Sequence, residues 1–138
     1  MTVEKSEQEV LEGKLDRALA EAETKTTKAL ESISNKREDS EKDVWAAAEA
    51  AEFASLIYAL TYGLEDSTGS TTGKRSPEEP VTILNAASQK LKTVQTLRGK
   101  GDKDSLLDGY KLLRGTTDDM RNVYLTLSKT ETKQQVTN

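Results

Sequence analysis

Apolar residues recur every three or four positions over the first part of the chain, which is the spacing of one face of an α-helix. Ser6 and Glu9 precede this stripe in the pattern of a capping box, so a helix is expected to begin there. Several members of the stripe are Ala or Thr, and such a shallow surface lets another helix approach closely. The stripe averages about 3.67 residues per turn and contains Leu11, Leu15, Ala18, Ala22, Thr26, Ala29 and Ile33, with Leu19 and Leu30 beside it.

The most apolar segment follows a polar break at 35–40 and predicts a second helix from about Glu41 to Tyr62. Ser40 is the expected N-cap, because a serine hydroxyl accepts a hydrogen bond from a free N–H of the first turn. Gly63 is the expected left-handed residue after the helix. Apolar residues occupy nearly every side of this helix, so we expect neighbouring helices to cover most of it.

A break in the apolar pattern separates the second helix from a third. Residues 65–79 are rich in Gly, Ser and Thr and predict a flexible loop. A proline at the first helical position is typical of a helix start, and both Pro77 and Pro80 fit this role. The third helix is expected to run to about Arg98, with Gly99 ending it.

The C-terminal part of the chain predicts two shorter helices and a tail. The first covers about 103–114, and Gly115 is expected to end it. The second begins at Thr116 or Thr117, whose hydroxyls are suitable for an N-cap. The apolar pattern then fades, and a disordered tail is expected at about 130–138.

These elements predict an all-α fold, namely an antiparallel helical bundle of four main helices plus a short extra helix. The first helix, of about 30 residues, is expected to be ~45 Å long and to extend beyond its neighbours. The length of 138 residues fits a single helical domain over 1–138. Only 4% of the residues are aromatic, which disfavours an aromatic-rich β-sandwich.

The composition narrows the chemistry. The chain contains no Cys and no His, which excludes disulfides, thiol nucleophiles, imidazole bases and zinc sites built from these residues. We therefore expect a protein that is not an enzyme, with no catalytic, cofactor-binding or metal-binding residues and no small-molecule ligand.

Two short motifs suggest ligand binding at first sight. Residues 69–75 contain two glycines and a lysine, but they lack the spacing and the final Ser or Thr of a phosphate loop. Asp102, Asp104 and Asp108 begin like a calcium loop, but they lack the ligands that such a loop needs at its fifth and twelfth positions. We interpret the first motif as a loop and the second as helix capping and surface charge.

Two carboxylates interrupt the apolar second helix. Glu49 and Glu52 lie three residues apart, but the di-iron pattern of helical bundles pairs Glu with His, and the chain has no His. We therefore expect either a polar seam that faces solvent or a salt bridge to Lys90, Lys92 or Arg98.

Targeting signals are not visible in the sequence. Residues 1–19 carry many charges and hold no apolar signal-peptide segment. The longest uncharged apolar stretch is Phe53 to Leu64, whereas a bilayer span needs roughly 20 apolar residues. We expect an intracellular protein without a membrane span.

The charge is distributed unevenly. Residues 1–66 carry a net charge of −8, and residues 67–138 carry +4. Three interpretations of this asymmetry are open. Both halves are ordinary solvated surfaces, or the two halves complement each other within the fold or between copies, or the basic half contacts an anionic partner. The bases around the turn after the third helix would contact phosphates in the last case; they are Lys90, Lys92, Arg98, Lys100, Lys103, Lys111 and Arg114. The low sequence pI of about 5.0 is unlike that of a typical nucleic-acid-binding domain.

Two functional hypotheses follow. The first is a non-enzymatic structural or interaction subunit, which self-assembles or binds another protein through helix-mediated contacts. Its contact surface would be the part of the first helix that extends beyond its neighbours, consisting of Leu11, Leu15, Ala18, Leu19 and Ala22. The alternative is a nucleic-acid-associated accessory or packaging subunit that uses the basic region at 90–114.

Overall fold

The computed structural model describes residues 6–36, 38, 40–64 and 79–136, with side chains as far as Leu127. Within these ranges the chain is helical and has no β-strand, so the all-α prediction is confirmed there. The helices are α1 (Glu7–Ser34), α2 (Ser40–Tyr62), α3 (Pro80–Lys100) and α4 (Lys103–Val136).

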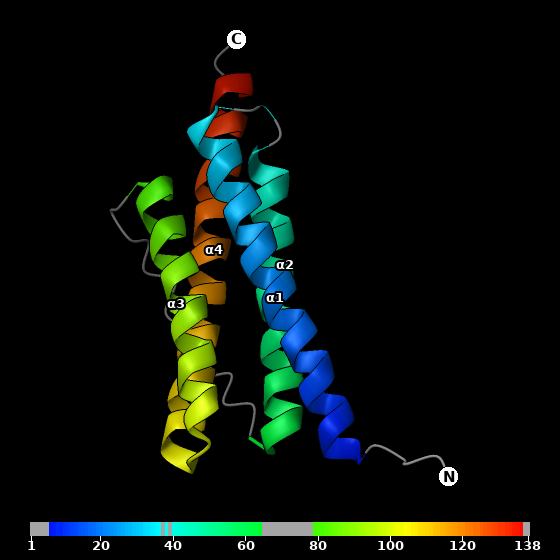
Figure 1. The fold of residues 1–138 in the computed structure, drawn as a ribbon. Helices are drawn as coiled ribbons and strands as arrows, with labels where there is room; N and C mark the ends of the chain where they lie inside the picture. The colour runs from blue at the N-terminus through cyan, green and yellow to red at the C-terminus, as the bar shows by residue number, and fades with distance from the viewer. Residues whose placement is uncertain (1–5, 37, 39, 65–78, 137–138) are drawn as a thin grey trace.

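The four helices form a bundle in which every helix packs against two others. α1 contacts α2 and α3, and α4 contacts the same two helices. In Figure 1, α1 and α4 run upward while α2 and α3 run downward, so each helix is antiparallel to both of its neighbours. The end of α2 and the start of α3 therefore lie at opposite ends of the bundle. A flexible loop is expected between them at about 65–79, and residues 65–78 of it lie outside the described residues.

The N-terminal ends of the first two helices use their serines differently. The Ser6 hydroxyl accepts a hydrogen bond from the Glu9 N–H at 3.2 Å, which is the predicted cap of α1. Ser40 was expected to cap α2 but is its first helical residue. Its hydroxyl donates to the carbonyl oxygen of Ser32 at 3.2 Å, so this serine links the start of α2 to the end of α1.

Left-handed glycines end α2 and α3. Gly63 follows α2 with φ 62°, as the sequence predicts. α3 begins at Pro80, one of the two prolines considered, but it does not end at Gly99. Its C-cap is Gly101, with φ 77° and an N–H that donates to the carbonyl of Arg98 at 3.2 Å. Only one of these two nearby glycines has the positive φ that stops the helix.

The largest difference from the sequence prediction lies in α4, which is one continuous helix where a short helix, a break at Gly115 and a last helix were expected. Thr116 and Thr117 do not cap a new helix. Their hydroxyls donate to the carbonyls of Leu112 and Leu113, four residues earlier, at 2.8 and 2.9 Å. Both threonines are fully buried. Packing of this face keeps the helix continuous through Gly115, although glycine disfavours a helix interior.

The helix lengths also differ from the prediction. α4 has 34 residues and α1 has 28, so the first helix is not the longest element. At 1.5 Å per residue the two helices are ~51 Å and ~42 Å long. The backbone of α4 is described as far as Val136, and residues 137 and 138 lie outside the described ranges. The disordered tail expected at about 130–138 stays a prediction.

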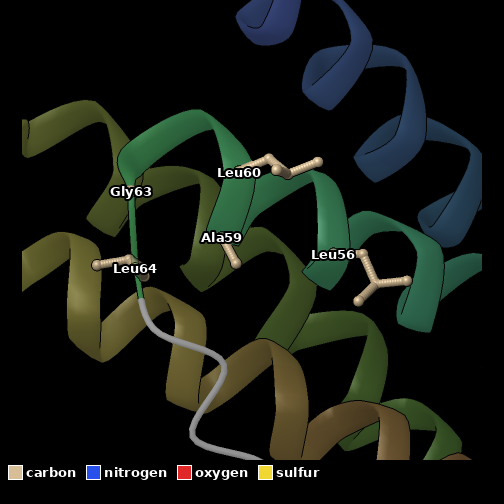
Figure 2. A pocket seen from close by; sticks show the side chains of 5 residues that line it. All are labelled: Leu56, Ala59, Leu60, Gly63 and Leu64. Carbon is tan, nitrogen blue, oxygen red and sulfur yellow. The ribbon is translucent and has the colours of Figure 1, made fainter.

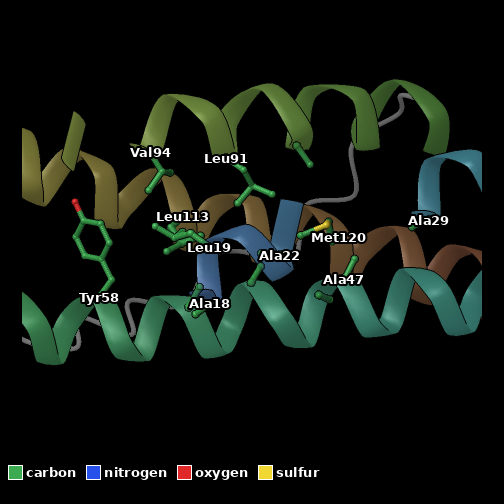
Figure 3. Close-up of a cluster of buried hydrophobic side chains, with 14 of the residues drawn as sticks. Ala18, Leu19, Ala22, Ala29, Ala47, Tyr58, Leu91, Val94, Leu113 and Met120 are labelled. Carbon is green, nitrogen blue, oxygen red and sulfur yellow. The ribbon is translucent and has the colours of Figure 1, made fainter. Parts of the chain in front are cut away.

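Side chains from all four helices meet in the core, as Figure 3 shows for Leu19, Ala47, Leu91 and Met120. Both α1 and α2 bury several alanines, which allows their backbones to lie close together. The shallow stripe of the first helix is thus used inside the chain. The buried alanines of these two helices are Ala18, Ala22, Ala29, Ala47, Ala48, Ala51, Ala54 and Ala59.

Two glycines inside α4 differ in their surroundings and allow a matched test of this packing. A Cβ at Gly109 would overlap the hydroxyl of the buried Tyr58 and lie 3.3 Å from its Cζ, whereas a Cβ at Gly115 would meet nothing within 4 Å. We expect Gly115→Ala to raise the free energy of unfolding by ~0.5–1 kcal/mol through helix propensity. We expect Gly109→Ala to lower it by ~1–2 kcal/mol, because Tyr58 must shift.

Urea unfolding followed by circular dichroism measures both changes. The Tyr58→Phe background is the control, because removing the hydroxyl removes the overlap and should abolish most of the loss caused by Gly109→Ala. A Gly115→Ala variant less stable than the wild type would contradict a continuous α4.

Candidate interaction surface

The apolar surface that the sequence assigns to a partner lies inside the bundle. Leu15, Ala18, Leu19 and Ala22 are buried by the chain's own helices, and Leu11 is partly buried. α1 contacts both α2 and α3, so its apolar face is already covered. The expectation of a free apolar stripe on the first helix is therefore corrected, because Leu15, Ala18, Leu19 and Ala22 form part of the core.

A different helix presents exposed apolar side chains. Trp45, Phe53, Leu56 and Leu60 of α2 are between 42% and 66% exposed. Together with the exposed Glu49 they follow one another at spacings of three or four residues, which places them on one side of the helix. We call these five residues the outer face of α2. The face extends over about four turns, or ~22 Å.

The packing of α2 explains why this face is left open. α2 contacts only α1 and α4 among the described helices, and the residues that face them are buried, including Val44, Ala51 and Tyr58. The sequence showed that α2 is apolar nearly all round and predicted that neighbours would cover most of it. A helix with two neighbours has one side turned outward, and on α2 that side is apolar as well.

A hollow lies at the C-terminal end of the same helix. Figure 2 shows the five described residues that line it, which come from the last two turns of α2 and the residues just after them. Leu56 and Leu60 belong both to the hollow and to the outer face, so the two features are continuous. The lining residues are Leu56, Ala59, Leu60, Gly63 and Leu64.

The two carboxylates of α2 have different surroundings. Glu52 lies at the edge of the outer face and forms an ion pair with Arg121 of α4. Glu49 is exposed, and no ion pair to it is found among the described residues. The expected salt bridge to Lys90, Lys92 or Arg98 is therefore wrong in its partner, while the expected polar, solvent-facing position fits Glu49.

Arg98 is used to hold the helices together at one end of the bundle. Its Nε donates to the Tyr62 hydroxyl at 2.7 Å, Nη2 donates to the Glu12 carbonyl at 3.3 Å, and Nη1 forms an ion pair with Asp16. Burial acts to lower the pKa of Arg98, but the hydrogen bonds to Asp16 and Tyr62 outweigh it and the net pKa is raised. This side chain of α3 therefore links α1 and α2.

Two further members of the basic region make contacts inside the bundle. Lys90 forms an ion pair with Asp119 at 3.0 Å, and Arg114 donates to the Ser55 hydroxyl at 3.2 Å. These contacts join α3 to α4 and α4 to α2. They reduce the number of bases of this region that are free to meet phosphates.

The remaining bases of the region lie on exposed surface among acids. Asp102, Asp104 and Asp108 are exposed in the same stretch, so the local charge is mixed. Nucleic-acid contact by this region stays a prediction. Part of the region's positive charge is used in contacts inside the bundle, and nearby acids balance another part. The exposed bases are Lys92, Lys100, Lys103 and Lys111.

The motifs that suggested ligand binding have structural explanations or fall outside the described residues. Asp102 caps α4 by accepting a hydrogen bond from the Ser105 N–H at 3.0 Å. Hydrogen bonds from the Ser105 side chain and backbone lower the pKa of Asp102. The segment 69–75 lies outside the described ranges. Within those ranges, no cluster of three or more acidic side chains is arranged to hold a metal ion.

Neither protein-family models, nor curated proteins, nor solved structures match this chain. Among the described helices, none has an apolar stretch long enough to cross a bilayer. Its function must therefore be inferred from the surfaces of the bundle itself.

Proposed function

We propose that this protein is a non-enzymatic interaction subunit that contacts other proteins through the outer face of α2. The observation that supports this is the row of exposed apolar side chains at Trp45, Phe53, Leu56 and Leu60. Isolated exposed apolar residues are ordinary on a soluble protein, but several on one helix face are typical of a surface that binds another helix.

The position of this face on the bundle supports the same function. The opposite side of α2 is held in the core, so the helix does not need to rearrange in order to present its apolar residues. A preformed helix loses little conformational freedom when it binds, which favours affinity. Hydrogen bonds from Arg98 to the Tyr62 hydroxyl and from Arg114 to the Ser55 hydroxyl connect α2 to α3 and α4.

Site-specific photo-cross-linking in the native cells tests the proposal. A photoreactive amino acid at position 60 should give a discrete protein adduct, because Leu60 is the most exposed large apolar residue of this face. The same amino acid at position 89, an exposed polar site on α3, is the matched control and should not give that adduct. Leu56→Ser, introduced into the chain that carries the photoreactive amino acid at position 60, should remove the adduct.

The mass of the adduct also separates the two forms of the hypothesis. An adduct of twice the chain's mass indicates self-assembly, and any other discrete mass indicates a different protein. Identical products from positions 60 and 89, or no product from position 60, would refute the proposed surface.

A further inference from the structure

Glu49 divides the outer face of α2 into two apolar parts. It lies four residues after Trp45 and four before Phe53, so it is one helical turn from each on the same side. It is exposed and has no ion-pair partner among the described residues. Any molecule that covers Trp45 and Phe53 must therefore also cover this carboxylate.

Covering Glu49 has an energetic consequence. A carboxylate that loses water without gaining a hydrogen-bonding or charged partner is strongly disfavoured. A partner that fits the whole face must therefore bring apolar side chains to Trp45, Phe53, Leu56 and Leu60 and a cation to Glu49. Asp43 and Glu52 of α2 already form ion pairs with Lys28 and Arg121, so the carboxylate of the outer face that a partner's cation would meet is Glu49.

Two antiparallel alignments of α2 with the α2 of a second copy fail to meet these requirements. When two α2 helices pack antiparallel with their outer faces fully overlapped, Glu49 of one copy lies opposite Leu56 of the other. Moving Lys42 of one copy opposite Glu49 would place Leu56 and Leu60 beyond the start of the facing helix. Neither alignment covers the apolar residues and neutralises Glu49 at the same time.

The basic helix of a second copy does not fit either. α3 has four bases and no acid, but its large apolar residues, among them Leu84 and Leu91, are buried in its own core. The surface it leaves exposed near Lys92 consists of polar residues such as Thr93 and Thr96. It would neutralise Glu49 without covering the apolar side chains.

These constraints identify the class of partner. Resting on the function proposed above, we infer that the outer face of α2 binds an amphipathic helix of another protein, in which a Lys or Arg lies within the apolar stripe and pairs with Glu49. The apolar side chains of that helix cover Trp45 on one side of the ion pair and Phe53, Leu56 and Leu60 on the other.

Two synthetic helical peptides of about 18 residues serve as probes. Both carry Leu at spacings of three and four residues and neutral polar residues elsewhere. One has Lys in the middle of the Leu stripe, and the other has Met there, which has similar length and no charge. Fluorescence anisotropy of labelled peptide measures binding to the full chain, and sedimentation of the chain alone measures self-association.

We expect the Lys peptide to bind about tenfold more tightly than the Met peptide, which is the size of one favourable charged contact. Glu49→Gln should abolish this difference. Leu60→Ser should weaken both peptides at least ~10-fold, because a large apolar contact is lost. Leu125→Ser is the matched control, since Leu125 on α4 is 48% exposed like Leu56 but lies outside the outer face, and it should leave binding unchanged.

Four results would overturn the inference. They are equal binding of the two peptides by the wild type, binding that Leu60→Ser leaves unchanged, no binding of either peptide up to about 1 mM, and a dimer of the chain that Leu60→Ser dissociates. If position 60 still forms an adduct with another protein in cells, the first three results refute only the basic helix and leave the proposed interaction function standing.

Discussion

Leu19→Glu is expected to unfold the bundle or to lower its free energy of unfolding by more than ~4 kcal/mol. Leu19 is 1% exposed and lies among core side chains from other helices. The substitution removes a buried Leu side chain, which costs about 2–5 kcal/mol, and it places a carboxylate among buried apolar side chains. Small domains are stable by only about 5–15 kcal/mol, so this loss is a large part of the total.

The matched variant is Leu60→Glu, the same change at a residue that is 66% exposed. It should alter the free energy of unfolding by no more than ~0.5 kcal/mol, as substitutions at exposed sites usually do. Far-ultraviolet circular dichroism and urea unfolding of both variants give the comparison. A folded, fully stable Leu19→Glu protein that has lost only an association would restore the original assignment of the first helix to a partner.

The sequence predicts the ends of a helix correctly where a residue within a few positions determines the cap. Ser6 begins α1 and Gly63 ends α2 because a hydroxyl or a left-handed glycine acts within a few residues. Gly115 shows the limit of such reasoning. Its propensity favours a break, but the neighbouring Thr116 and Thr117 are buried against the rest of the bundle, and this packing keeps α4 helical.

The outer face of α2 could not be predicted from periodicity alone, because periodicity does not show which helices are neighbours. The sequence showed that the second helix is apolar nearly all round, and a four-helix bundle gives each helix two neighbours, so an exposed apolar face was in principle predictable. Which residues form that face depends on which two helices pack against α2. That choice is made by tertiary packing, which the periodicity of a single helix does not specify, so the sequence predicts a covered helix where Phe53 and Leu60 are exposed.

The second large effect concerns Tyr58 and alkaline pH. Its hydroxyl donates to the carbonyl of Leu106 at 2.7 Å, so the neutral phenol joins α2 to α4. Burial is the main cause that raises the pKa of Tyr58 to about 12; Tyr62 adds to this increase, and the positive charge of Arg98 opposes it. The fold therefore favours the protonated form relative to the unfolded chain, in which a tyrosine has a pKa near 10.

Because the folded pKa is the higher one, the stabilisation is complete below about pH 10 and is lost as the pH rises towards 12. Two pKa units correspond to ~3 kcal/mol of unfolding free energy. Tyr58→Phe should be less stable than the wild type by ~1 kcal/mol at pH 8, because the hydrogen bond to Leu106 is absent. It should not show the alkaline loss that ionisation of Tyr58 causes, so the difference should shrink and reverse as the pH rises.

Urea unfolding at several pH values from about 8 to 12 checks this expectation. Tyr124→Phe is the matched control, because Tyr124 is a half-buried tyrosine of α4 whose ring contacts Trp45, with centroids 4.9 Å apart, whereas the ring of Tyr58 contacts Tyr62 and Tyr110. This variant should keep the alkaline loss of the wild type. Equal pH dependence in the wild type and in Tyr58→Phe would show that another group drives alkaline unfolding. The crossing of the two stability curves would instead assign it to the phenol that joins α2 to α4.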